Sequence, residues 1–332
     1  MKRREFTPLL LGAVASACFR PLAALAQKNE PMRRIGVLMG FDESDEVWQS
    51  YLASLKQRLQ ELGWIEDRNL RIYYRFTGDN AERTRIAAEE LVALAPNLIF
   101  VSTNPVVSAV MRATRSIPIV FTWVSDSVGS GFVASLARPG GNVTGFHNFE
   151  PQFGGKWLEV LKEAVPGLRR VAVLYVPEIT ANVALMGAAE AASPALEVTI
   201  VPAAVRDVAD IERVLTPFAR EPDVGLIVTP SPLTGTRRDV ITQVAARLRL
   251  PAIYPFGFYS ASGGLLSYGI DQLELVRGAG SYVDRILRGE KPGELPVQLP
   301  TKFRLVINLK TAKALGLSIP ESFLLRADEV IE

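Results

Sequence analysis

The chain has 332 residues, with 37 Lys and Arg against 35 Asp and Glu, and is 48% hydrophobic. This length is sufficient for two domain-sized cores, and the hydrophobic content excludes a disordered protein. The near balance of charge gives no indication of nucleic-acid binding. One histidine, His147, and one cysteine, Cys18, leave too few nitrogen and sulfur ligands for a zinc or copper site.

The first 26 residues have the pattern of an export signal. Basic residues occupy positions 2–4, an apolar run follows at 9–18, and residues 24–26 read Ala-Leu-Ala, the small-x-small pattern that precedes a cleavage site. The apolar run is shorter than the roughly 20 residues that a membrane-spanning helix needs. We therefore expect residues 1–26 to be a signal peptide and the mature protein to be periplasmic.

The route of export and the attachment to the membrane have alternatives. Residues 2–6 resemble a twin-arginine signal, which exports a folded protein, but the same basic start fits a general secretory signal. Cys18 follows Ala-Ser-Ala, so lipidation of Cys18 is a less favoured alternative to cleavage after Ala26. Lipidation at Cys18 would tether the protein to the membrane. Cleavage after Ala26 would release it, and the mature chain would then contain no cysteine for a disulfide.

From residue 35 onward, short apolar runs alternate with stretches of helical period, which is typical of parallel α/β structure. The first series predicts strands at 35–39, 70–76, 98–101, 118–122 and 142–146, and helices at 47–62, 80–95, from 104, and at 128–136. The second predicts strands at 171–175, 197–201, 224–229, 251–254, 264–268 and 302–308, and helices at 152–165, 182–192, 208–218, 236–248, 272–287 and 310–315. We predict two lobes, each with a doubly wound parallel sheet.

The usual catalytic motifs are absent from the sequence. It contains no Gly-x-Ser-x-Gly, no Gly-Lys-Ser/Thr and no Gly-x-Gly-x-x-Gly after the first strand. A Ser/His/Asp site would depend on His147, which follows the fifth strand and which we interpret as a hinge or surface residue. We expect no catalytic residue, no metal and no cofactor. An exported enzyme on a similar scaffold is the alternative function.

Ligands of open parallel sheets bind beyond the carboxyl ends of the strands, which selects loops of both lobes. The predicted loops are 40–43, 102–104, 123–127, 177–182, 230–233 and 255–259, together with the strand end at 267–271. The candidate ligand-binding residues on these segments are Phe41, Asp42, Ser102, Thr103, Asn104, Trp123, Ser125, Asp126, Asn182, Ser231, Phe256, Tyr268 and Asp271.

Two of these loops suggest how a ligand is held. Residues 102–104 precede a helix, so their hydroxyls and the free backbone N–H groups suit a carboxylate, although helix capping needs only one of them. The loop 123–126 joins an aromatic ring to a carboxylate, which suits a ligand with an amine and an apolar part. Alternatively, Trp123 packs in the core and Asp126 caps a helix. We predict that Asp126→Ala abolishes binding without unfolding the protein.

Four stretches of the chain carry a resemblance to a known family. They are Ile-Pro-Ile-Val-Phe running into Ser-Asp at 117–126, Arg-Pro-Gly-Gly-Asn-Val-Thr-Gly at 138–145, Gly-Gly-Leu-Leu-Ser-Tyr-Gly at 263–269, and the pattern Leu-Pro-x-Gln-x-Pro-Thr-Lys-Phe within 295–317. Together they resemble the ABC transporter substrate-binding proteins related to the tryptophan- and tyrosine-binding proteins. Family members often have Thr-Asp-Pro-Val where this chain has 125–128, and an Asn-Pro-rich loop at 175–180.

This resemblance implies a type I periplasmic binding fold, in which two lobes joined by three crossover segments close on a ligand. It places the crossovers at about 142–146, 267–271 and 296–302. The expected lobes are 33–144 plus 269–297 and 145–268 plus 298–332. The implied function is to enclose a small molecule, an amino acid or related carboxylate, and to deliver it to the membrane permease of an ABC transporter. We expect a monomer.

Overall fold

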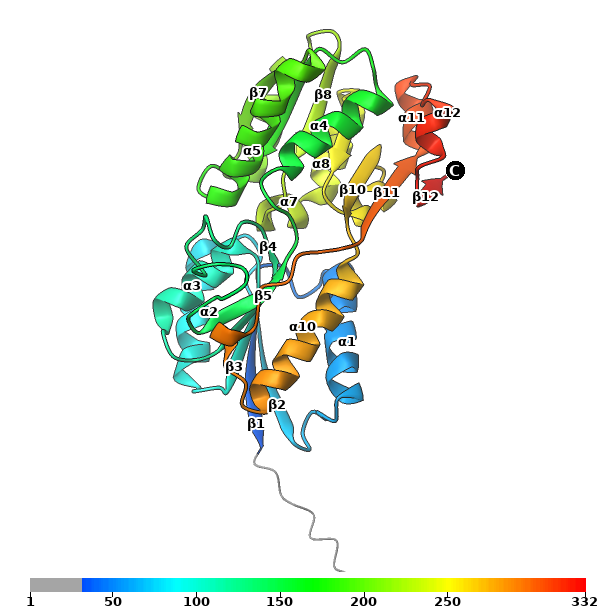
Figure 1. Cartoon of the computed structure of the whole chain (residues 1–332). Helices are drawn as coiled ribbons and strands as arrows, with labels where there is room; N and C mark the ends of the chain where they lie inside the picture. Colours follow the sequence, from blue (N-terminus) through cyan, green and yellow to red (C-terminus); the bar gives the residue numbers. More distant parts are fainter. Residues whose placement is uncertain (1–31) are drawn as a thin grey trace, which may run out of the picture. The chain divides into compact units, whose positions relative to one another are not determined.

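The computed structural model describes residues 32–332 (Figure 1). The predicted signal peptide, Cys18 and the cleavage site after Ala26 lie outside the described residues. Within the described part of the chain, no helix combines the length and the apolar character needed to cross a membrane.

The first sheet has five parallel strands in the order β2-β1-β3-β4-β5. They are β1 (Arg33–Met39), β2 (Leu70–Phe76), β3 (Leu98–Ser102), β4 (Ile119–Val124) and β5 (Val143–His147). Every residue of β3 and β4 is buried. Both faces of this sheet are therefore covered, as parallel sheets require.

Helices cover the two faces of the first sheet in pairs. They are α1 (Glu46–Glu61), α2 (Ala81–Ala93), α3 (Asn104–Ala113) and α10 (Gln272–Leu287). Helices α1 and α10 lie side by side, as do α2 and α3 (Figure 1). Successive residues of a strand point to opposite faces of the sheet. In β1, Val37 packs in the core cluster that includes α1, and Leu38 packs in the core cluster that includes α2 and α3. We call this sheet and these helices the first lobe.

The second sheet has seven strands in the order β12-β11-β10-β9-β8-β6-β7. They are β6 (Arg170–Tyr175), β7 (Thr199–Ala204), β8 (Val224–Val228), β9 (Ala252–Tyr254), β10 (Leu266–Ile270), β11 (Phe303–Asn308) and β12 (Glu329–Ile331). Strand β11 pairs antiparallel with β10, so this sheet is mixed and not parallel throughout. The chain re-enters the sheet from the first lobe, which reverses the direction of β11.

The helices of the second lobe follow the predicted alternation with strands. They are α4 (Phe153–Ala164), α5 (Thr180–Ala192), α6 (Val208–Phe218), α7 (Pro232–Thr236), α8 (Arg238–Arg247), α9 (Gly257–Ala261), α11 (Leu309–Leu315) and α12 (Glu321–Leu324), with short 3-10 turns η1 (Ser193–Leu196) and η2 (Pro292–Glu294). Helix α4 packs against α5, and α6 against α8.

The chain passes between the lobes three times. It leaves the first sheet after His147, at the end of β5, and returns at Asp271, between β10 and α10. The third passage comes after a segment that pairs with β5. In this segment the N–H of Gln298 donates to Gly145 O and the O of Gln298 accepts the N–H of His147, both at 2.9 Å. Strand β5 lies wholly in the first sheet and β10 wholly in the second. The first crossing therefore begins just beyond the predicted range 142–146.

Helix α1 shows how local sequence sets an element. Asp45 caps its first turn by accepting the N–H of Val47 at 3.1 Å, and Gly63 follows its end with a φ of 94°, which favours glycine. Its buried residues are Trp48, Leu52, Leu55 and Leu59, which recur at three- and four-residue spacing. The acidic residues Asp45 and Glu46 thus begin this helix, and the face that the helix buries includes Trp48.

The helix predicted over 128–136 does not form. Gly129 donates its N–H to Asp126 Oδ1, and Gly131 has a φ of 72°, so this segment folds as a turn followed by irregular chain. The predicted helix 236–248 forms as α8, and the short helix α7 that precedes it was not predicted. Strand β12 and helices α9 and α12 were not predicted, because each has five residues or fewer and shows no clear period.

Candidate functional site

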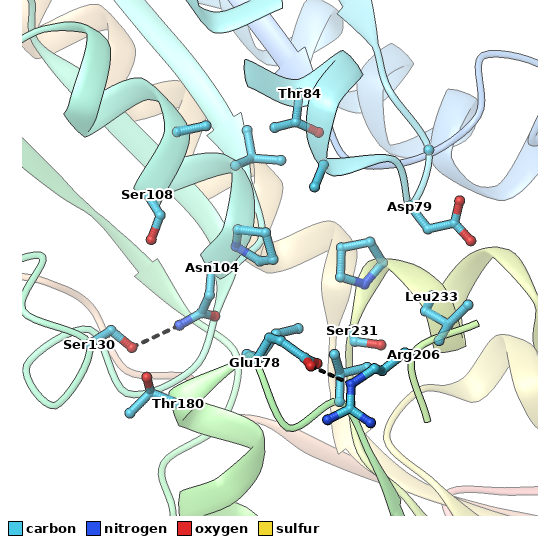
Figure 2. Close-up of a pocket in the computed structure, with 18 of the residues that line it drawn as sticks. Asp79, Thr84, Asn104, Ser108, Ser130, Glu178, Thr180, Arg206, Ser231 and Leu233 are labelled. Carbon is cyan, nitrogen blue, oxygen red and sulfur yellow. Dashed lines mark hydrogen bonds and ion pairs between the residues drawn. The ribbon is translucent and has the colours of Figure 1, made fainter. Parts of the chain in front are cut away.

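A cavity of ≈ 340 Å³ lies between loops and helix ends of the two lobes (Figure 2). Helices α2 and α3 line it from the first lobe, and the loop after β6 and the start of α7 line it from the second. We call it the outer cavity. Its polar lining residues are Asp79, Thr84, Asn104, Ser108, Arg112, Ser130, Glu178, Thr180, Arg206 and Ser231.

A smaller cavity of ≈ 20 Å³ shares part of this lining. We call it the inner cavity. Its rings are Phe41, Trp48, Trp123 and Phe256, and its polar residues are Thr103, Asn104, Asn148 and Ser231. The two cavities have five lining residues in common, which are Asn104, Pro105, Ile179, Ser231 and Pro232. Among the described residues, no acidic or basic side chain lines the inner cavity.

Aromatic packing limits the inner cavity to about the size of one water molecule. Phe41 stacks on Trp48 with their ring centroids 3.4 Å apart, and Trp123 meets Trp48 edge to face at 5.1 Å. Phe258 of the second lobe meets Trp48 at 5.7 Å. Tyr51 packs on Trp123 at 5.8 Å, and burial raises the pKa of its hydroxyl. The chain's own rings thus occupy this end of the cleft.

The first turn of α3 faces both cavities without a side-chain cap. Its N-cap residue, Thr103, is buried, has a φ of 62° and makes no capping hydrogen bond. Its Oγ1 has no hydrogen-bond partner in the described part of the chain. The free N–H groups and the positive end of the helix dipole at this turn favour an anion.

Asn104, at the start of α3, is fully engaged with the loop after β4. Its Nδ2 donates to Ser130 Oγ at 3.0 Å (Figure 2) and to Ser125 O at 2.7 Å, and its Oδ1 accepts the N–H of Ser125 at 3.0 Å. These bonds use both donors and an acceptor of the amide. Asn104 therefore shapes the cleft mainly by fixing residues 125–130.

Three residues around the cleft have a left-handed backbone that non-glycine residues rarely adopt. They are Thr103, Trp123 and Asp126, with φ of 62°, 54° and 45°. At Trp123 the pairing of β4 with β5 shifts register, and the indole N–H donates to Gln272 Oε1 at 3.3 Å. Strain of this kind costs roughly 1–3 kcal/mol a residue and clusters at functional sites.

Two further residues of the inner cavity hold donors without partners. Trp48 is 1% exposed, and its Nε1 has no hydrogen-bond partner in the described part of the chain. Asn148 is also buried, and its Oδ1 accepts Ser125 Oγ–H at 2.6 Å and Phe149 N–H at 2.7 Å. The N–H of Phe149 fixes which end of this amide is the oxygen. The amide's NH₂ group is then left for a ligand.

Six of the predicted site residues line the cavities, and three more support the loops that do. The lining residues are Phe41, Thr103, Asn104, Trp123, Ser231 and Phe256. Among the supporting residues, Ser102 Oγ accepts the N–H of Gly40 at 2.9 Å and Ser125 Oγ bonds Asn148. The third, Asn182, joins the loops after β6 and β8.

The other four predicted residues line neither cavity. Asp42 lies beside Gly78, and Asp126 Oδ1 accepts the N–H of Gly129 at 2.9 Å within its own turn. Tyr268 packs against Phe303 in the second lobe. Asp271 caps α10 and lines separate cavities beside the crossover segments. The role predicted for Asp42 and Asp126 therefore has no support from the lining of the two cavities.

Two ion pairs and a ring contact bridge the lobes in this structure. Arg238 of α8 binds both carboxylate oxygens of Asp45, at 3.2 Å to Oδ1, and the two side chains are only 15% and 9% exposed. Arg237 reaches Asp79 at 3.4 Å. These residues, with Trp48 and Phe258, connect the start of α1 to α8 and α9. These contacts hold the two lobes together on this side of the cleft.

His147 contacts a serine and a glutamate, as a catalytic histidine does, but the serine is fully buried. Its Nε2 lies 2.6 Å from Ser127 Oγ, and its Nδ1 contacts Glu150. Ser127 is fully buried and lines none of the cavities, and its own N–H also donates to Nε2 at 3.1 Å. The three residues stabilise the first crossing. In the described part of the chain, no group of His, Cys, Asp and Glu is placed to hold a metal.

Comparison with known proteins identifies the family. The family model of ABC transporter substrate binding proteins matches residues 44–331. The chain belongs to this family. These substrate-binding proteins act outside the cytoplasm, and the alternative of an exported enzyme gains no support.

Individual relatives in the family are similar over most of their length. The tyrosine-binding protein of Clostridioides difficile (strain R20291) is 26% identical over 292 residues, which cover 87% of this chain and 82% of the relative. A domain from Streptococcus pneumonia in complex with L-Trp has a TM-score of 0.84 at 25% identity, covering 90% of this chain and 100% of that one. A conserved domain protein from Vibrio cholerae has the same TM-score at 27% identity, covering 90% and 99%.

Loss of Asn182 is expected to destabilise this binding protein. Its Oδ1 accepts from Val176 N at 3.1 Å and Thr229 Oγ1 at 3.0 Å, and its Nδ2 donates to Pro230 O at 2.9 Å. Asn182→Ala removes these three bonds, although Thr229 Oγ1 still donates to Leu174 O, so we expect the free energy of unfolding to fall by about 2–4 kcal/mol in urea titrations. Val183→Ala, at an exposed position of α5, is the control and should change it by less than about 0.5 kcal/mol. Equal effects would contradict the role of Asn182.

Proposed function

We propose that this protein binds a small carboxylate, an amino acid or related acid, in the cleft and delivers it to the permease of an ABC transporter. The carboxylate would occupy the end of the cleft where α3 begins. Contacts from both lobes then favour the closed state when the solute is bound. The family supports transport, and the lining of the cleft supports an acid.

The observation that carries this proposal is the set of unused donors at the inner cavity. The uncapped turn of α3 supplies backbone N–H groups, and Thr103 Oγ1 and Trp48 Nε1 are buried without partners. Trp48 Nε1 can only donate a hydrogen bond, so its partner must be an acceptor. A carboxylate would satisfy several of these donors at once, which removes the cost of leaving them unpaired.

The body of the solute would lie in the outer cavity. Its volume of ≈ 340 Å³ is within the range of small-molecule sites. Its apolar wall consists of Ala81, Pro105, Val106, Ala109, Phe132, Val176, Ile179, Pro232 and Leu233. The similarity to a domain solved in complex with L-Trp and to a tyrosine-binding protein supports an acid with an aromatic side chain as the solute.

The remaining parts of the proposal follow from the sequence. Residues 1–26 would direct the chain to the periplasm, and lipidation at Cys18 is the less favoured alternative to release after Ala26. The protein would act as a monomer with the permease as its membrane partner and without catalysis. The two lobes, whose boundaries would lie near His147 and Asp271 and beyond Gln298, would move as two units around the crossover segments.

Native mass spectrometry followed by a thermal-shift screen tests this function. We expect native mass spectrometry to detect one small acid bound per purified chain. If the chain is purified without a ligand, we expect some members of a panel of amino acids and aromatic acids to raise its melting temperature. A ligand at a hundred times its Kd adds about 2.7 kcal/mol of stability, which is easily detected. Turnover of the bound solute would revive the enzyme alternative. Stabilisation by neutral solutes only would contradict an acid ligand.

A further inference from the structure

The cleft offers donors to a solute but no buried partner for a positive charge. Among the described residues, the inner cavity has no acidic lining residue. The outer cavity has two, Asp79 and Glu178, and both are paired with arginines, Arg237 and Arg206. Glu178 and Arg206, whose pairing Figure 2 shows, are more than half exposed, and the side chain of Asp79 is 28% exposed. Solvent screens charges at such positions.

The carboxylates nearest the cleft in sequence line neither cavity. Asp126 accepts the N–H of Gly129 in its own turn. Asp45 caps α1 and binds Arg238 across the lobes. Asp42 lies over Gly78, outside both cavities. An ammonium group beside a carboxylate held at Thr103 would therefore be buried without an anionic partner, at a substantial cost in free energy.

We infer that this receptor selects carboxylic acids that carry an apolar or aromatic body and no α-ammonium group, of the size of an aryl propionate. The inference rests on the proposed function, because it assumes that the acid group lies at the start of α3. An inner cavity of ≈ 20 Å³ admits a carboxylate oxygen but no ring, so the acid enters first and the body stays in the outer cavity. The solute class then differs from that of the relatives with L-Trp and tyrosine.

Isothermal titration calorimetry with matched pairs tests this inference. The probes are 3-phenylpropionate against L-phenylalanine and 3-(indol-3-yl)propionate against L-tryptophan, each titrated into the mature protein. We expect at least one of the two propionates to bind, with an affinity at least tenfold higher than that of its amino acid. An amino acid that binds as tightly as its propionate would overturn the inference and leave the proposed function intact.

Two further outcomes separate the inference from the function on which it rests. Binding of none of the four probes overturns the inference, whereas the function fails only if no acid in the wider thermal-shift screen stabilises the protein. Asp126→Asn provides the second arm. We expect it to leave the Kd of every probe within twofold, because Asp126 lies outside both cavities. Selective weakening of L-phenylalanine or L-tryptophan in this variant would show that Asp126 holds an ammonium group and would overturn the inference.

Discussion

Thr103→Val is expected to lower the affinity for the solute by about tenfold to a hundredfold without destabilising the ligand-free protein. A hydrogen bond to a charged group contributes about 1.5–3 kcal/mol, which corresponds to this loss. Valine keeps the shape and the β-branch of Thr103, so the strained backbone is unchanged. In the ligand-free protein the Oγ1 has no partner, and its removal is expected to leave stability equal or higher. Calorimetry and urea titration measure the two effects.

Thr122→Val is the matched control for this variant. Thr122 is also fully buried with an unpartnered Oγ1, but it lies in β4 and lines neither cavity. We expect its effect on stability to resemble that of Thr103→Val and its effect on affinity to be less than twofold. If both variants bind the solute as the native protein does, Thr103 does not contact it.

Arg238→Gln is expected to open the cleft and weaken binding by about tenfold to a hundredfold. Its guanidinium binds Asp45 across the lobes, and both groups are largely buried. Removing one partner of a buried pair costs about 3–5 kcal/mol when the other charge stays buried. Here the lobes can separate and return Asp45 to water, so we expect the cost to appear as opening and not as unfolding. Small-angle scattering should show a larger radius of gyration for the ligand-free variant.

The control for this experiment is Arg247→Gln on the same helix. Arg247 pairs with Glu212 within the second lobe, and both side chains are more than half exposed. Such pairs contribute little, so affinity should change by less than twofold. Unchanged affinity and radius of gyration in Arg238→Gln would show that the bridge to Asp45 does not hold the lobes closed.

Periodicity in the sequence predicted most elements of the fold, because buried strands and amphipathic helices leave regular apolar patterns. The helix predicted at 272–287 matches α10, and the predicted strands 35–39 and 70–76 match β1 and β2 closely. Strand direction is not encoded in such patterns. The antiparallel pairing of β11 depends on where the chain re-enters the second sheet, which only the tertiary structure shows.

The lining of the candidate site was predicted where loop position determines it and missed where side-chain partners do. Thr103 and Phe256 follow strands and line the cleft as the rule for parallel sheets implies. Trp48 lies on the buried face of α1, where its spacing indicates only core packing, and nothing local reveals an unpartnered indole N–H. Asp126 follows a strand, as the rule for parallel sheets requires, but its carboxylate accepts a hydrogen bond from Gly129 within the same loop.

A structure of the protein with its solute bound tests the central claim most directly. We predict a carboxylate at the first turn of α3, within hydrogen-bond distance of Thr103 Oγ1 and Trp48 Nε1, with the body of the solute in the outer cavity. A solute whose acid group lies instead at the rim, beside Arg112 or Arg206, with both buried donors still unpartnered, would contradict it.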